Sequence, residues 1–309
     1  MKPLSLWLIT SAVIASVMVV SPAVAGELTG TLKKIKEIGA ISIGYRNSSV
    51  PFSYLDDDQK PIGYAMDICQ VIVDAVQKEL KLDKLEVKLV AVSSATRIPL
   101  MANGTIDLEC GSTTNNSERE KQVAFTNSHF LTASRFVSKK VNKVGGIDGL
   151  KGKPVSSTSG TTTIKQVNQA NRERSLGLTV LAARDHAEGF LMVETDQAVA
   201  FVMDDILLAG LIAQSKDPAA YEISEEAFSE PEPYAIMLRK DDPAFKAVVD
   251  RATADLFRGP DGIRLYEKWF LQPIPPKGLA LHMPMSPALR KAFASPSDSP
   301  DPESYTKLR

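Results

Sequence analysis

The stretch Ala-Ile-Ser-Ile-Gly-Tyr-Arg at residues 40–46 alternates apolar and polar side chains, which is the period of a β-strand. Apolar residues then recur at helical spacing after Asp67, a residue type that caps helices: Ile68, Val71, Ile72, Ala75, Val76 and Leu80. Residues 85–92, rich in Val and Leu, have the pattern of a second strand. Strand, helix and strand in this order predict a parallel sheet with a right-handed crossover.

The same pattern continues on both sides of this stretch. Before it, residues 28–38 predict a basic helix that ends at Gly39. After it, Ser94 is placed to cap a short helix that ends at Gly104, and residues 106–110 alternate as a third strand. The first unit therefore contains at least three strands with helices between them.

A second α/β unit follows the glycine pair at residues 145–146. Its predicted strands are residues 154–158, 178–182 and 198–203, and its helices begin near Thr162, Asp185 and Asp204. Two separate connections join the units, at residues 130–137 and about 229–236. This arrangement predicts an α/β protein with two lobes.

The length of 309 residues is sufficient for two domains. We expect lobe 1 to comprise residues 26–132 and 234–294, with lobe 2, residues 133–233, inserted between them. Residues 295–309 lack apolar periodicity, so we expect a disordered tail there.

Residues 1–25 have the pattern of a secretory signal peptide. Lys2 gives a basic start, residues 4–20 are apolar, and Ala-Val-Ala at residues 23–25 is a small-x-small cleavage site. A transmembrane anchor is the alternative, which Pro22 and the small residues disfavour. We expect cleavage after Ala25 and export. The formal net charge of −1 gives no reason to expect nucleic acid or an anionic membrane as a partner.

The sequence has two cysteines, Cys69 and Cys110. In an exported protein they are able to form one disulfide, which stabilises by roughly 3–4 kcal/mol for a loop of this length. Two buried free thiols are the alternative. The spacing fits no metal site, and we expect no metal.

Three arginines, Arg46, Arg97 and Arg119, each follow a predicted buried strand or begin a helix. Such positions are where α/β folds hold their ligands. Asp204 is placed in the same way later in the chain. Three guanidinium groups and one carboxylate predict a pocket for an amino acid with two carboxylates and one ammonium, and His186, if charged, would add a further positive charge.

Two polar segments add hydrogen-bond donors for a carboxylate. Residues 107–119 leave a strand and turn toward a helix, with Ser112 and Thr114 on the way to Arg119. Residues 159–163 place a glycine and hydroxyl groups, among them that of Thr162, at the start of another helix. Either segment alone also fits an ordinary capped helix.

The sequence lacks the motifs of common enzyme classes. It has no Gly-x-Ser-x-Gly turn, phosphate-binding loop, His-Glu-x-x-His motif or dinucleotide-binding glycine pattern. Its three histidines are scattered, and His186 and Glu109 are the only candidates for an acid or base beside a ligand. We therefore expect no enzyme activity and no cofactor.

Several segments resemble the periplasmic glutamate/aspartate-binding proteins of amino-acid ABC importers, which belong to solute-binding protein family 3. They lie at residues 48–54, 97–100, 109–116, 203–205, 238–243 and 273–277, and the resemblance covers nearly all of the chain after the signal peptide. It implies a type II periplasmic-binding-protein fold, in which a two-stranded hinge joins two lobes that clamp the ligand.

The resemblance also implies roles for individual residues. Those that would hold the α-carboxylate are Arg119, Ser112, Thr114 and Thr162, while Asp204 would bind the ammonium group. Those that would hold the side-chain carboxylate are Arg46, Ser94, Arg97 and His186.

By resemblance, the protein is a periplasmic monomer that delivers glutamate or aspartate to an inner-membrane ABC permease. Two other functions stay open. One is a sensory module that hands its ligand to a receptor, and the other is a dehydratase-like enzyme on the same scaffold.

Overall fold

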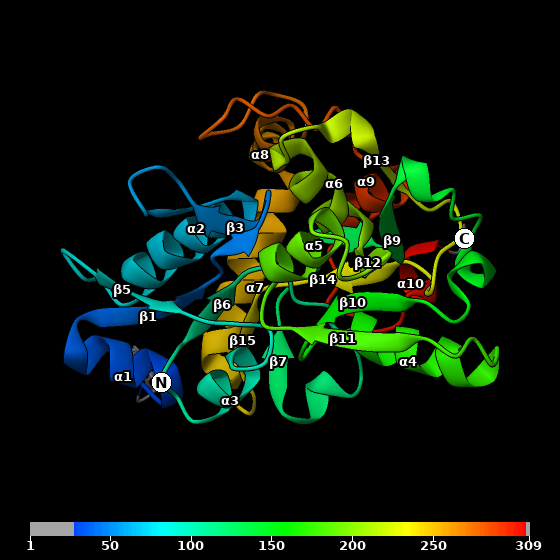
Figure 1. Cartoon of the computed structure of the whole chain (residues 1–309). Helices are drawn as coiled ribbons and strands as arrows, with labels where there is room; N and C mark the ends of the chain where they lie inside the picture. The colour runs from blue at the N-terminus through cyan, green and yellow to red at the C-terminus, as the bar shows by residue number, and fades with distance from the viewer. Residues whose placement is uncertain (1–27, 307–309) are drawn as a thin grey trace, which may run out of the picture.

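The computed structural model describes residues 28–306, which form two α/β lobes (Figure 1). The predicted signal peptide and its cleavage site lie outside the described residues. Within residues 28–306, no helix combines the length and the apolar character that a membrane span needs.

Lobe 1 is built on a five-stranded sheet that takes strands from both halves of the chain. In spatial order these are β5 (Glu86–Ala91), β1 (Ala40–Tyr45), β6 (Leu108–Cys110), β15 (Met237–Arg239) and β7 (Val123–Phe125). Strand β1 pairs in parallel with β5 and β6, as the strand–helix–strand pattern predicts, whereas β15 runs antiparallel to β6 and β7. The chain therefore returns to the first lobe after completing the second.

Helices and one small sheet pack around the main sheet of lobe 1. The helices are α1 (Gly30–Ile38), α2 (Tyr64–Glu79), α3 (Arg97–Ala102), α7 (Pro243–Arg258) and α8 (Pro260–Phe270). The small sheet contains β2 (Ser48–Ser49), β3 (Ser53–Leu55) and β4 (Pro61–Ile62). Helix α1 ends as predicted, at Gly39 with a left-handed φ of 71°.

Two predicted helix caps of lobe 1 are wrong. Helix α2 begins three residues before Asp67, with Gly63 at the N-cap, so Asp67 lies inside the first turn. Its carboxylate instead accepts hydrogen bonds from Lys268 and Trp269 of α8. The N-cap of α3 is Thr96, because the Ser94 hydroxyl is used in the interlobe site described below.

Lobe 2 repeats the architecture with its own five-stranded sheet. In spatial order its strands are β11 (Thr179–Ala183), β10 (Pro154–Thr158), β12 (Ala200–Asp204), β9 (Ser134–Lys139) and β13 (Tyr221–Ile223). Its helices are α4 (Thr162–Glu173), α5 (His186–Glu194) and α6 (Asp205–Gln214). Short 3₁₀ turns connect several elements, at Arg119–Lys121, Lys140–Asn142, Ile147–Leu150 and Pro218–Ala220.

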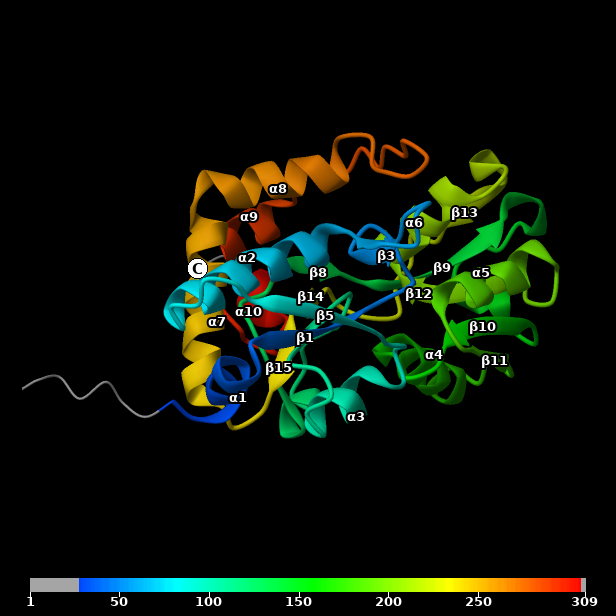
Figure 2. The same ribbon diagram turned by 90° about the vertical axis from the view of Figure 1, so that its left-hand side faces the viewer.

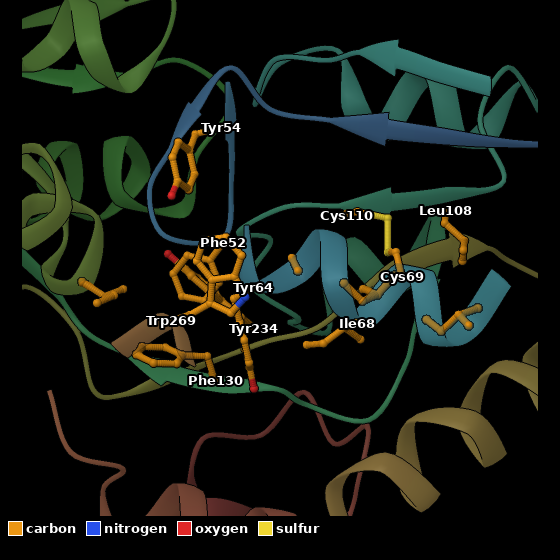
Figure 3. Close-up of a cluster of buried hydrophobic side chains, with 14 of the residues drawn as sticks. Phe52, Tyr54, Tyr64, Ile68, Cys69, Leu108, Cys110, Phe130, Tyr234 and Trp269 are labelled. Carbon is orange, nitrogen blue, oxygen red and sulfur yellow. A yellow bond between two sulfur atoms is a disulfide. The ribbon is translucent and has the colours of Figure 1, made fainter. Parts of the chain in front are cut away.

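Two antiparallel strands link the lobes (Figure 2). They are β8 (Phe130–Thr132) and β14 (Glu232–Tyr234), and they fall within the two predicted connections. An aromatic cluster holds their lobe 1 ends: Phe52 lies 5.1 Å from Phe130 and 5.3 Å from Tyr234 between ring centroids (Figure 3). Phe130 also stacks on Phe270. This hinge is therefore fixed to the core of lobe 1.

Cys69 and Cys110 form a disulfide with a Cα–Cα distance of 6.2 Å (Figure 3). It joins α2 to β6, and both residues are fully buried. Of the two alternatives that the sequence leaves open, the disulfide is confirmed.

The C-terminal segment differs from the disordered tail that its composition predicts. After α9 (Pro287–Ala294), residues 295–306 run along lobe 1 and end in α10 (Glu303–Thr306). Tyr305 is only 5% exposed, and its hydroxyl lies 2.8 Å from Ser128 Oγ. Asn115 Nδ2 donates to the Asp298 carbonyl at 2.8 Å. One buried aromatic side chain and specific polar contacts hold a segment that has no apolar periodicity.

Candidate functional site

The nine predicted ligand-binding residues meet where the lobes face each other. Lobe 1 supplies Arg46, Ser94, Arg97, Ser112, Thr114 and Arg119, and lobe 2 supplies Thr162, His186 and Asp204. All except Thr162 are buried. At the edge of the site, a cavity of about 300 Å³ is lined from lobe 1 by Arg46, Asn47, Ser48, Ala91, Val92, Ser93 and Thr96, and from lobe 2 by Arg184 and Asp185.

Arg46 follows β1 and is 2% exposed. Its Nη2 donates to Ser94 Oγ at 2.8 Å and lies 3.5 Å from His186 Nε2 of lobe 2. Its Nη1 has no hydrogen-bond partner within residues 28–306. Burial, together with the nearby Arg97 charge, lowers the pKa of Arg46 to about 10, so the group is still cationic at neutral pH.

Arg97 begins α3 and is also 2% exposed. Its Nη1 donates to the Ser112 carbonyl at 3.2 Å and lies 3.9 Å from Glu109 Oε1. Among the described residues, Arg97 Nε and Ser112 Oγ are buried without a partner. These atoms provide free hydrogen-bonding capacity beside a guanidinium charge.

Arg119 bridges the two lobes. Its Nη1 donates to the Thr114 carbonyl at 2.8 Å, and its Nη2 donates to the Gly160 carbonyl of lobe 2 at 3.3 Å. Beside it, Thr114 Oγ1 lies 3.5 Å from Thr162 Oγ1, a second contact between the lobes. Burial and the Arg97 charge lower the pKa of Arg119 to about 9.

His186 is neutral, contrary to the possibility of an added charge. Burial, followed by the charges of Arg46 and Arg97, lowers its pKa well below the ordinary value. Because Arg46 has only donors, Nε2 is the acceptor of that contact and Nδ1 carries the proton. Nδ1 then donates to Thr158 Oγ1 at 2.9 Å. The imidazole therefore orients Arg46 without adding charge.

Asp204 ends β12 and is 4% exposed. Its Oδ1 accepts from Ser134 Oγ and Thr163 Oγ1, both at 3.2 Å, and its Oδ2 accepts from the hydroxyl of Tyr234. Burial raises the pKa of this carboxyl group. Ser134, Thr163 and Tyr234 were not predicted, because single hydroxyl residues in strands and helix starts carry no distinctive sequence signal.

The sequence also underestimates the negative charge of the site. Glu109 is fully buried and accepts from Thr113 Oγ1 at 2.5 Å, while its Oε1 faces Arg97. Glu232 of the hinge accepts from Thr162 Oγ1 at 3.4 Å. An acidic residue inside the alternating strand 106–110 is the signal that indicates Glu109. Two further carboxyl groups therefore lower the positive charge expected from three arginines and one aspartate.

Glu232 is expected to make stability depend on pH. Burial and the Asp204 carboxylate raise its pKa from 4.5 to about 7. Because its pKa is raised in the folded state, the protonated Glu232 carboxyl contributes fully to the free energy of unfolding below pH 4.5. This contribution is lost as pH rises through about 7. We expect Glu232→Gln to raise the free energy of unfolding by up to about 3 kcal/mol at about pH 8 and by less than about 1 kcal/mol at about pH 5.

Urea unfolding of the ligand-free wild type and variant at both pH values measures this difference. Every other titratable group is common to the two proteins, so the difference between them reports Glu232 together with its coupling to Asp204 and Arg119. A gain that is equal at both pH values would contradict the assignment.

The profile of the bacterial extracellular solute-binding proteins, family 3, matches residues 41–272. The L-glutamate/L-aspartate-binding protein of Pseudomonas aeruginosa is 48% identical over 294 residues, which cover 94% of this chain and 96% of that protein. The glutamate/aspartate import solute-binding protein of Escherichia coli is 44% identical over 268 residues, 87% of this chain and 88% of that protein.

Among solved structures, an ancestral amino-acid-binding protein described as a precursor of cyclohexadienyl dehydratase is similar with a TM-score of 0.66 and 26% identity. The match covers 78% of this chain and 99% of that chain. With two sheets of five strands and a two-stranded connection, the fold is that of the type II periplasmic binding proteins. The chain belongs to the bacterial extracellular solute-binding proteins, family 3.

Proposed function

We propose that this protein binds L-glutamate or L-aspartate between its lobes and delivers it to an ABC permease of the inner membrane. One observation carries the proposal. Arg46 Nη1 and Arg97 Nε are donors of buried guanidinium groups that lack a partner within residues 28–306. A buried cationic donor without an acceptor is costly, and a second carboxylate on the ligand removes that cost.

The residue roles follow the chemistry of each part of the site. The α-carboxylate is bound by Arg119 with the hydroxyl groups of Ser112, Thr114 and Thr162. The ammonium is bound by Asp204, which Ser134, Thr163 and Tyr234 hold in place. The side-chain carboxylate is bound by Arg46, Arg97 and Ser94, with neutral His186 behind Arg46.

Ligand binding favours the closed arrangement because the two lobes contribute different parts of the clamp. A ligand shifts a conformational equilibrium only through interactions that differ between its states. Arg119 and Thr114 of lobe 1 meet Gly160 and Thr162 of lobe 2 only when the lobes are together. The closed protein then presents one surface made of both lobes to the permease.

The protein acts in the periplasm after removal of residues 1–25, and it acts as a monomer without turnover of its ligand. The relatives that are named for glutamate and aspartate support import over a sensory role. The two candidates for acid–base chemistry are already engaged, since Glu109 is bound to Thr113 and His186 to Thr158. These contacts support binding over a dehydratase-like activity.

Calorimetric titration with glutamate, aspartate, glutamine and asparagine tests the proposal. We expect dissociation constants on the order of micromolar or tighter for the two acids and at least roughly tenfold weaker binding of the amides. Small-angle scattering is expected to show compaction with glutamate, and chromatography is expected to recover the glutamate unchanged. The proposal would be contradicted if glutamine and asparagine bound as tightly as glutamate and aspartate, or if glutamate bound tightly without compaction.

A further inference from the structure

Two glycines of lobe 2, Gly210 and Gly160, lie against the backbone of lobe 1. A Cβ atom placed on Gly210 of helix α6 would lie 2.6 Å from the carbonyl oxygen of Val50. A Cβ atom on Gly160 would lie 2.6 Å from Ala95 Cα and 2.7 Å from Ala95 N. Real Cβ atoms essentially never approach another atom this closely, so both contacts require glycine.

Neither side of the Gly210 contact has room to move. The turn that carries Val50 is tied to its own lobe, because Phe52 N donates to the Ser49 carbonyl at 2.7 Å and Tyr64 N to the Pro51 carbonyl at 2.8 Å. Val50 itself is 3% exposed. On the other side, the neighbours of Gly210 on α6 that are buried in the core are Ile206, Leu207, Leu208 and Leu211. A side chain at position 210 therefore has to separate the lobes.

We propose that Gly210 and Gly160 are positioning residues that determine how far the lobes close, and hence the ligand affinity. Gly210 lies outside the proposed ligand shell, and Gly160 borders it through its carbonyl, which accepts from Arg119. This inference rests on the proposed function, in which affinity arises from closure. Glycine is a poor residue for the interior of a helix, so its presence in α6 opposes local stability. The close approach of Val50 gives position 210 a reason to be glycine.

Gly210→Ala is the cleaner test of the two positions. Gly210 has no left-handed φ, so alanine fits helix α6 when lobe 2 is apart from lobe 1. Gly160 has a φ of 78°, and any other residue there would be strained. Gly145→Ala is the matched control, because a Cβ there has nothing within 4 Å and lobe 2 also carries it.

We expect Gly210→Ala to weaken glutamate binding at least roughly tenfold, chiefly through faster dissociation. The ligand-free variant is expected to melt at the same temperature as the wild type or higher, and Gly145→Ala is expected to bind like the wild type. Calorimetry, stopped-flow dissociation and thermal melting measure these quantities. Unchanged glutamate affinity, or a lower melting temperature of the free variant, would overturn the proposal.

A second readout is independent of any ligand. Thr114 Oγ1 and Thr162 Oγ1 lie 3.5 Å apart across the lobes, so the pair Thr114→Cys and Thr162→Cys reports closure by forming a disulfide under mild oxidation. Adding Gly210→Ala to this pair is expected to slow cross-linking at least roughly tenfold, and Gly145→Ala is expected to leave it unchanged. An equal rate with Gly210→Ala overturns the steric proposal. If the wild type binds none of the four amino acids, the proposed function fails, and cross-linking still decides the role of Gly210.

Discussion

Alanine in place of Arg97 is expected to weaken glutamate binding at least roughly tenfold, and to weaken glutamine binding much less. The guanidinium of Arg97 is 2% exposed, and its Nε has no partner within residues 28–306. Hydrogen bonds between charged groups in such a buried place are stronger than those between neutral groups, because water does not compete for them. In Arg97→Ala, the side-chain carboxylate of glutamate loses a strong charged hydrogen bond, whereas the neutral amide of glutamine loses only a weak one.

Arg97→Ala also affects stability through the neighbouring Glu109. Removing Arg97 takes away the guanidinium that lies 3.9 Å from Glu109 Oε1 in a buried place, and leaves only the charges of Arg46 and Arg119 to stabilise that carboxylate. Such a loss is destabilising. We expect the variant to stay folded, since Thr113 still donates to Glu109. The double variant Arg97→Ala/Glu109→Gln is expected to recover stability without recovering glutamate affinity.

Arg251→Ala is the control for the loss of an arginine. Its side chain is 58% exposed and pairs with Glu79 at the surface of lobe 1. We expect calorimetry to give wild-type affinity for this protein. Circular dichroism and thermal melting report the folding of all three variants, and unchanged glutamate affinity in folded Arg97→Ala would refute its role in binding the side-chain carboxylate.

Loss of the disulfide is expected to have the largest effect on stability. Cys69 and Cys110 are 41 residues apart and join α2 to β6 in the core of lobe 1. In the chain-entropy account, this link removes conformational freedom from the unfolded chain, and for such a loop it is worth roughly 3–4 kcal/mol. We therefore expect Cys69→Ala/Cys110→Ala to unfold at a temperature lower by on the order of 10 °C.

Glutamate affinity below the transition is expected to change little, since both cysteines lie in the hydrophobic core of lobe 1. A reducing agent supplies the control. It is expected to lower the melting temperature of the wild type toward that of the double variant and to leave the variant unchanged. Equal melting temperatures of the oxidised wild type and the variant would contradict this account.

Much of the architecture was predictable because it depends on periodic burial. The alternation at residues 40–46 and the helical spacing after it identified β1 and α2, and two separate connections identified the hinge. The start of α2 was not predicted, because its first turn is set by the backbone at Gly63. The packed C-terminal segment was missed because one aromatic side chain, Tyr305, and a few polar contacts hold it, and such contacts have no sequence period.

The candidate site was predictable to the extent that charge and position identify it. The three arginines and Asp204 follow strands or begin helices, and the structure brings them together. The charge contributions of Glu109 and Glu232 were harder to predict. Glu109 stands out in its strand, but its contact with Arg97 depends on the packing of α3 against β6. Glu232 meets Thr162, which lies 70 residues away in the sequence. Protonation states, such as that of His186, depend on burial, which only coordinates reveal.

Tyr234 belongs to two parts of the molecule at once. Its ring packs against Phe52 in lobe 1 (Figure 3). Its hydroxyl donates to Asp204 in lobe 2, the residue proposed to bind the ammonium. Mutations that change the aromatic packing of lobe 1 are thus expected to affect the binding of the ammonium group in lobe 2, because Tyr234 connects the two. Evolutionary drift in the core packing of lobe 1 is consequently expected to alter ligand affinity as well as stability in this protein.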